Sequence, residues 1–133
     1  MLANYLLIGA GGFLGTLARA LLSSAIASRV GETFPWGTLL VNVSGCFFIG
    51  LFAALTGPEG RYIVSPNLRQ FVMIGFCGGY TTFSSFSLQT LSLVRDGDVL
   101  RGGANVALST FTCLVAVWLG FAAATAVNRL KGS

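Results

Sequence analysis

The chain has 133 residues, of which 54% are hydrophobic and 9% are charged, and its formal net charge at pH 7 is +4. Soluble domains carry roughly 25% charged residues, so the composition excludes a soluble protein and indicates an integral membrane protein of one domain, residues 1–133. The eight basic residues are dispersed rather than clustered, which argues against a nucleic-acid-binding surface.

Four apolar stretches are long enough to cross a hydrocarbon core of about 30 Å as helices of about 20 residues. They are residues 5–26, 37–55, 68–93 and 104–127. All four acidic residues fall in the short connections between them. The first stretch lacks the basic region that precedes a signal peptide, so we expect it to remain as a transmembrane helix. The predicted fold is an all-α membrane protein with four transmembrane helices.

The first predicted helix combines a close-packing motif with a charge. Gly11 and Gly15 have the GxxxG spacing that lets helix backbones approach closely. Arg19 is the only charged side chain well inside a span, where arginine costs about 2.5–3.5 kcal/mol on insertion scales and usually faces protein or water. Two interpretations of Arg19 stay open: a buried structural or electrostatic role, or a side chain that snorkels to the interface.

The second predicted helix begins near Pro35 and Trp36, which suit a first helical turn and the headgroup level. Thr38 and Asn42 then share one face by their i,i+4 spacing. A carboxamide inside a span brings two N–H donors that are costly to bury unsatisfied. Asn42 therefore serves either an interhelical hydrogen bond, which periodicity alone favours, or a permeating ion.

The third predicted helix, residues 68–93, contains a signal for an interruption. Gly78 and Gly79 each lower helix propensity by about 1 kcal/mol relative to alanine, and Thr81 or Thr82 can cap a helix that restarts after them. Unpaired backbone groups at membrane depth are tolerated only where they are buried in protein or line a cavity, and interrupted helices mark the ion sites of many transporters. We therefore expect a helix broken in mid-membrane, with something bound there.

The residues after the expected interruption suit a small anion. Phe83 and Phe86 are one turn apart on one face, and Ser84 and Ser85 lie on neighbouring faces. Aromatic edges are electropositive, hydroxyls donate hydrogen bonds, and helix N-termini favour anions. Gln89 is the last polar group of this apolar run.

The fourth predicted helix adds few polar groups, among which Ser109 and Cys113 share a face. The chain has three cysteines, one each in the second, third and fourth spans, and no histidine. Without metal-ligand spacing we interpret the cysteines as small buried apolar residues. General acid–base catalysis has no candidate within the spans, so we do not expect an enzyme.

The loop charges do not choose an orientation in the membrane. Four spans place both termini on one side, which carries Arg61, Arg69, Arg129 and Lys131, whereas the other side carries Arg29, Arg95 and Arg101. Loop lysines and arginines normally set the orientation, and here they are nearly balanced. Either other factors decide, or the chain inserts both ways and pairs antiparallel. Four spans are also few to enclose a conduction path, so we expect a homo-oligomer.

Three motifs together resemble the Fluc/CrcB family of fluoride channels. They are Gly12-x-x-Gly15-x-x-x-Arg19, Pro35-Trp36-Gly37-Thr38-Leu39-x-Val41-Asn42 and Gly75-x-x-Gly78-Gly79-x-Thr81-Thr82-Phe83-Ser84-x-Phe86-Ser87. The resemblance covers the first three spans in order and spacing. It implies a passive fluoride-selective channel that exports cytoplasmic fluoride across the bacterial inner membrane, built as an antiparallel, dual-topology homodimer with two pores.

The resemblance also implies roles for individual residues. Phe83 and Phe86 would line the pores, and Asn42 would donate to the passing anion. A polar track would add Ser84, Ser85, Thr38 and, more weakly, Ser109. The carbonyls of Gly78 and Thr81 would meet their two-fold mates around a central structural sodium ion. Gln89 departs from the pattern, because family members often carry glutamate at this place.

Three other interpretations stay open. A small proton-coupled multidrug exporter also has four spans, but it resembles a carrier with a glutamate inside its first helix, and this first span has none. A non-transporting scaffold would use the glycines and hydroxyls only to hold helices together. A pair of homologues with opposite orientations would form a heterodimer instead of a homodimer.

Overall fold

A computed structural model describes residues 1–131, which form an all-helical structure. The elements in chain order are α1 (Leu2–Val30), α2 (Trp36–Leu55), α3 (Pro66–Gln70), the π-helix η1 (Phe71–Cys77), α4 (Gly78–Tyr80), α5 (Phe83–Arg95) and α6 (Val99–Lys131). Four helical segments are long and apolar enough to cross a membrane, with Pro66–Arg95 counted as one. The prediction of four membrane-length helices is confirmed.

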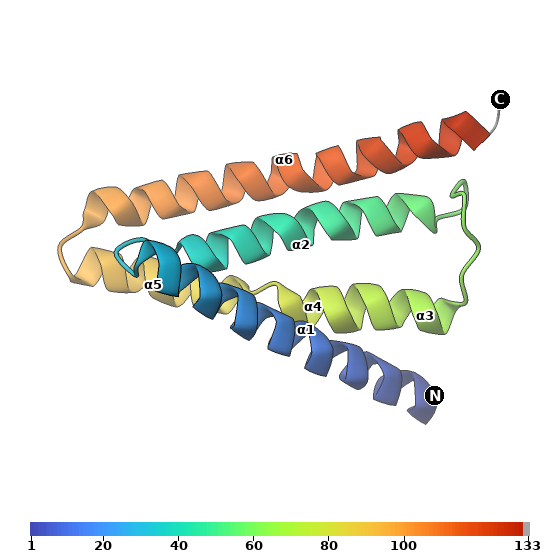
Figure 1. Ribbon diagram of the computed structural model, residues 1–133, viewed down its shortest axis with the longest axis horizontal. Helices are drawn as coiled ribbons and strands as arrows, with labels where there is room; N and C mark the ends of the chain where they lie inside the picture. Colours follow the sequence, from blue (N-terminus) through green and yellow to red (C-terminus); the bar gives the residue numbers. More distant parts are fainter. Residues whose placement is uncertain (132–133) are drawn as a thin grey trace.

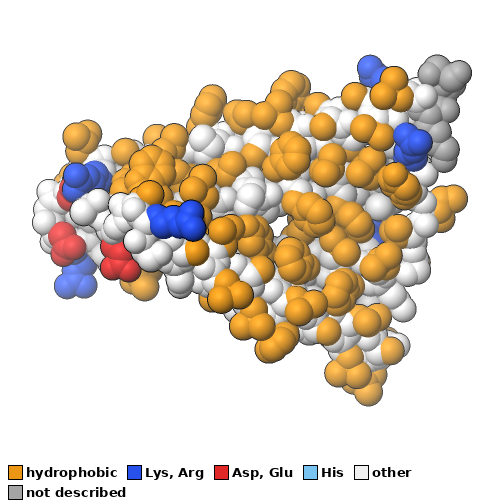
Figure 2. Space-filling view, in the orientation of Figure 1, with side chains coloured by type: hydrophobic (Ala, Val, Ile, Leu, Met, Phe, Trp, Pro, Cys, Tyr) orange, Lys and Arg blue, Asp and Glu red, His pale blue; other side chains and the backbone are white. Residues whose placement is uncertain are grey.

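The long segments alternate in direction along the chain, as Figure 1 shows. Segments α3 to α5 run parallel to α1, and α6 runs parallel to α2, which lies beside it. In Figure 2 the charged side chains gather toward the two ends of the molecule, and hydrophobic side chains cover the surface between them. This distribution suits a protein whose two ends face water and whose middle faces lipid.

Glycines bring α1 against the first half of the third segment. A Cβ atom on Gly79 would lie 2.5 Å from the carbonyl oxygen of Gly12, and one on Gly75 would lie 2.7 Å from that of Ile8. A Cβ on Gly15 would overlap the backbone of Phe76. Only hydrogen side chains fit these contacts, so the two backbones pack at the closest approach that helices allow. We call this contact the glycine seam.

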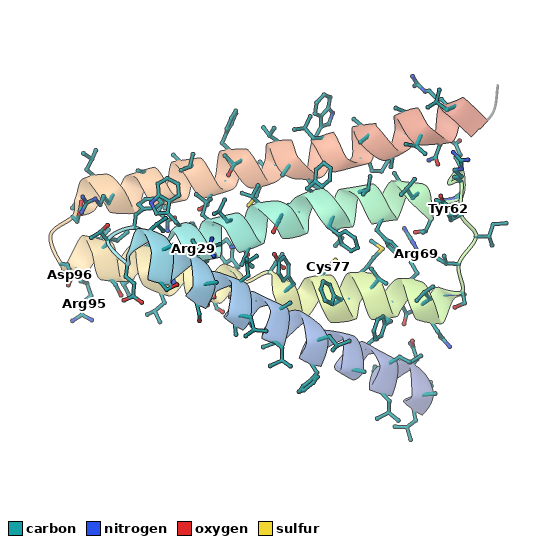
Figure 3. The ribbon with its side chains drawn as sticks, in the orientation of Figure 1. Arg29, Tyr62, Arg69, Cys77, Arg95 and Asp96 are labelled. Carbon is teal, nitrogen blue, oxygen red and sulfur yellow. The ribbon has the colours of Figure 1, made fainter. Side chains whose placement is uncertain are left out.

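The C-terminal end of α2 is fastened to two other segments. Each of its last four carbonyl groups accepts a hydrogen bond. The carbonyls of Phe52, Ala53, Ala54 and Leu55 accept from Thr56, Arg69, Asn128 and Tyr62, respectively. Figure 3 shows Arg69 at this end, between α2 and the third segment. Because these groups are the ones that a helix end leaves unpaired, their pairing fixes α2 relative to both α3 and α6.

Candidate functional site

The third segment changes conformation at two threonines. Helix α4 ends at Tyr80, Thr81 has φ −84° and ψ 158°, Thr82 has φ −152° and ψ 111°, and α5 begins at Phe83. Both threonines are therefore extended, and Thr82 caps α5 by accepting a hydrogen bond of 3.1 Å from the Ser85 N–H. Two extended residues redirect several backbone groups away from helical pairing.

Asn42 of α2 pairs with the backbone of Thr82 in both directions. Its Nδ2 donates to the Thr82 carbonyl oxygen at 3.1 Å, and its Oδ1 accepts from the Thr82 N–H at 2.7 Å. The side chain thus gives the Thr82 N–H the partner that the extended conformation removes, and it adds a donor to the Thr82 carbonyl, which as the N-cap carbonyl also accepts the first bond of α5. The second N–H of the carboxamide has no part in these two bonds and stays available as a donor.

The same rearrangement releases two carbonyl groups from their usual donors. In a continuous helix the Thr82 N–H would bond to the Gly78 carbonyl, and the Ser85 N–H would bond to the Thr81 carbonyl. Here those two N–H groups donate to Asn42 and to the Thr82 hydroxyl instead. Gly78 is exposed, and a Cβ on it would meet no atom within 4 Å. The carbonyls of Gly78 and Thr81 therefore lose their helical donors, as does that of Tyr80 just before the interruption.

Arg19 binds the carbonyl group between them. Its Nε donates to the Gly79 carbonyl oxygen at 3.0 Å, and Thr16 Oγ1 donates to the same oxygen at 3.5 Å. The guanidinium is part-buried between α1 and α4. This contact supports the structural interpretation of Arg19 and places a fixed positive charge beside the extended residues.

The first turn of α5 faces outward. Phe83 is 80% exposed in the single chain, and its ring lies 5.3 Å from that of Phe86, centroid to centroid. Ser84 and Ser87 are also exposed, and Ser85 is half-buried. Two aromatic rings and several hydroxyl groups thus gather on a surface that the chain itself does not cover.

A buried polar chain links α6 to α5, and sequence reasoning missed its centre, Asn105. This residue is 2% exposed and its Nδ2 donates to Thr90 Oγ1 at 2.9 Å. Ser109 donates to Asn105 Oδ1 at 3.2 Å, and Thr90 donates to the carbonyl of Phe86. The available signal was the i,i+4 spacing of Asn105 and Ser109 in an apolar span, which matches that of Thr38 and Asn42.

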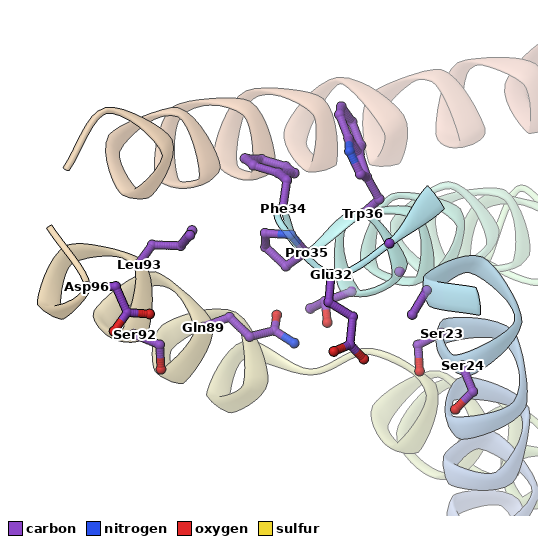
Figure 4. A pocket seen from close by; sticks show the side chains of 14 residues that line it. Ser23, Ser24, Glu32, Phe34, Pro35, Trp36, Gln89, Ser92, Leu93 and Asp96 are labelled. Atoms are coloured by element: carbon purple, nitrogen blue, oxygen red, sulfur yellow. The ribbon is translucent and has the colours of Figure 1, made fainter. Parts of the chain in front are cut away.

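A pocket of about 480 Å³ opens at the N-terminal end of α2. Figure 4 shows the side chain of Gln89, from α5, extending across it toward Glu32 of the α1–α2 connection. Thr38 also lines the pocket, and no side chain caps the α2 N-terminus beside it. Asn42 lies one turn farther along α2, about 6 Å from Thr38 along the helix axis. One residue that lines the pocket, Thr38, therefore lies one helical turn from the side chain that binds Thr82.

The structure brings some predicted site residues together and separates others. Asn42 contacts Thr82, which adjoins Phe83, and Thr38 lies one turn away on the same helix. Ser109 instead belongs to the buried chain centred on Asn105. Among residues 1–131 no group of three histidine, cysteine or acidic side chains could hold a metal ion.

Comparisons with known proteins agree on one family. The model of the family described as CrcB-like protein, Camphor Resistance (CrcB), matches residues 6–121. A protein of Opitutus terrae is 61% identical over 129 residues, covering 97% of this chain and 98% of the relative. A protein of Methylocella silvestris is 55% identical over 130 residues, covering 98% and 99%. Both carry the name fluoride-specific ion channel FluC. The chain belongs to the CrcB-like family.

Proposed function

We propose that this chain is the subunit of a passive, fluoride-selective ion channel that exports cytoplasmic fluoride across the bacterial inner membrane. Relatives named fluoride-specific ion channels, matched over nearly the full length, support this function. The observation that carries it in the structure is the pairing of Asn42 with Thr82, which holds two extended residues beside exposed aromatic and hydroxyl groups. We place this interruption at mid-membrane. No catalytic step is part of the proposal.

Fluoride is strongly hydrated, so a channel must replace its water with other donors and still let it leave. The remaining amide hydrogen of Asn42 and the hydroxyls of Ser84 and Ser85 are such donors. The ring edges of Phe83 and Phe86 add weak positive potential, and the N-terminal end of α2 at Thr38 favours an anion in the pocket. Ser109 donates to Asn105, so we assign it to the wall of the path.

The functional unit in this proposal is an antiparallel homodimer with two pores. A single chain leaves Phe83, Ser84 and Ser87 exposed, and hydroxyl groups that face lipid are costly. A second copy would cover these side chains and form the part of the pore wall that α5 alone does not provide. The near balance of arginines and lysines between the two ends supports insertion in both orientations.

A central sodium ion fits the groups around the interruption. The carbonyls of Gly78 and Thr81 have lost their usual donors to Asn42 and Thr82, whereas the Gly79 carbonyl is occupied by Arg19. Carbonyl oxygens suit hard cations. A Cβ on Gly78 would meet no atom within 4 Å, so a second copy could bring its own Gly78 and Thr81 carbonyl groups to the same ion. The bound ion would supply positive potential close to the anion path.

The experiment is electrogenic ion efflux from liposomes that contain the purified protein and either potassium fluoride or potassium chloride. Valinomycin starts potassium efflux, and anion loss is followed with ion-selective electrodes. We expect rapid fluoride loss and retained chloride. Folded protein that releases no fluoride would overturn the proposal and favour a scaffold, and proton-coupled release of a cationic drug would favour the exporter.

A further inference from the structure

Two of the three cysteines lie opposite one another on neighbouring helices, and the proposed fluoride path uses neither. Cys46 is on α2, Cys113 is on α6, and both are half-buried. Cys46 is the group that acts on the Cys113 thiol. Cys77, on η1, is buried and belongs to the third segment.

The packing of α2 on α6 independently explains this pairing. A Cβ atom on Gly50 would overlap the carbonyl oxygen of Val117 and lie 3.1 Å from its carbonyl carbon, and one on Gly120 would overlap the Phe47 carbonyl oxygen. The two helices run parallel (Figure 1), so a step of four residues toward the N-terminus on each leads from Gly50 and Val117 to Cys46 and Cys113. The cysteines therefore face one another where the backbones approach closely.

The number of ligands selects the kind of ion. No group of three histidine, cysteine or acidic side chains gathers within residues 1–131, so these thiols lack the four ligands of a structural zinc site. Thiolates prefer soft metal ions, and soft ions such as Cu⁺, Ag⁺ and Hg²⁺ accept linear coordination by two sulfur atoms. We propose that Cys46 and Cys113 form a binding site for one soft, two-coordinate metal ion.

Binding of Hg²⁺ at this site would form two S–Hg bonds and break two S–H bonds, and the two protons would pass to solvent. No oxidant or reductant takes part. The second bond forms within one molecule, at an effective concentration that raises affinity by about 10²-fold or more over a single thiol. Cys77 would hold Hg²⁺ by one bond only.

The test is a titration of the purified full-length protein with Hg²⁺, followed by removal of loose ions with a monothiol competitor and measurement of intact mass. We expect the unsubstituted protein and Cys77→Ser to keep one mercury atom that replaces two hydrogens. Cys46→Ser and Cys113→Ser should keep none, because their affinity for Hg²⁺ should be lower than that of the unsubstituted protein by about 10²-fold or more. Retention by these two variants, or loss by Cys77→Ser, would overturn the proposal.

A second measurement uses the unsubstituted protein alone, in case a variant does not fold. X-ray absorption at the mercury edge reports the ligands and their number directly. Two sulfur ligands in a linear arrangement are the expected result. Coordination by a single sulfur would contradict the site.

Discussion

The two halves of the third segment differ in what covers them. The first half, up to Tyr80, packs along the glycine seam, where Gly75 and Gly79 meet the backbone of α1. The second half, α5, has no fully buried residue and presents Phe83 and Ser84 outward. The first half is held in place by backbone contact, and in the proposed channel the second half presents its side chains to an ion and to a second subunit. Substitutions should separate these two roles.

The largest effect is expected in the glycine seam. Gly15→Val puts side-chain atoms onto the backbone of Phe76, and neither helix can retreat without losing the other glycine contacts. We expect destabilisation of about 3 kcal/mol or more, at the upper end of overpacking costs, and loss of monodisperse protein in size-exclusion chromatography. Gly9→Ala is the control, because its Cβ meets nothing within 4 Å. Equal yields of both variants would show that the seam is loose.

Asn42→Ala should affect both halves, because it leaves the N–H of Thr82 without a partner. The expected cost is about 1–3 kcal/mol for this unsatisfied group, with loss of fluoride efflux. Asn42→Asp keeps the acceptor for the Thr82 N–H, so it should unfold at a higher temperature than Asn42→Ala. Because it adds a negative charge, it should still fail to conduct an anion.

Ser44→Ala is the matched control for Asn42, since it also removes an interhelical hydrogen bond of α2, the one to Tyr80. Its fluoride efflux should stay near that of the unsubstituted protein. If Asn42→Ala conducted as well as Ser44→Ala, the carboxamide would have only a packing role.

Substitution of Arg19 tests the first half of the third segment without changing any residue of α5. Its bond to Gly79 uses Nε, and a lysine has no donor at that point of its side chain. We expect Arg19→Lys to lose nearly as much stability as Arg19→Met, about 1.5–3 kcal/mol for a hydrogen bond to a charged group, measured by thermal unfolding. A fully stable Arg19→Lys would instead indicate a snorkelling side chain.

The smallest effect is expected at the pocket. Gln89→Glu adds a negative charge to the space that Glu32 already lines. A like charge about 4 Å from a passing anion in water costs about 1 kcal/mol, so fluoride efflux at neutral pH should fall roughly fivefold and recover in acid, where the carboxylate is protonated. Glu32→Gln removes a charge from the same pocket and should raise efflux. Unchanged efflux in both variants would place the ion path elsewhere.

Much of this fold can be predicted from the sequence because the length and hydrophobicity of each span indicate a transmembrane helix. The GxxxG spacing of Gly11 and Gly15 likewise predicts close packing, and the structure supplies the partner. The π-helix Phe71–Cys77 was not predictable, since its wide turn reflects packing against α1 rather than a local pattern. Asn105 was missed although its i,i+4 spacing to Ser109 was a signal, because its bond to Thr90 depends on the packing of α6 against α5.

The candidate site was predictable in its residue types more than in its contacts. The sequence placed Asn42 and Thr82 on different helices and gave no register between them. Their two hydrogen bonds, and the release of the Gly78 and Thr81 carbonyls that follows, depend on tertiary packing. The roles of Phe83, Phe86, Ser84, Ser85, Thr38 and Ser109 in ion flow stay predictions.

Fluoride efflux through Phe83→Leu, measured together with its elution profile and thermal unfolding, tests the proposed ion path along α5 most directly. Phe83 is 80% exposed in the single chain, so its ring contributes little to the fold of one subunit. We expect folded protein, with unfolding close to that of the unsubstituted protein, and fluoride efflux reduced to the level of protein-free liposomes. Full efflux through folded Phe83→Leu would contradict an ion path along α5.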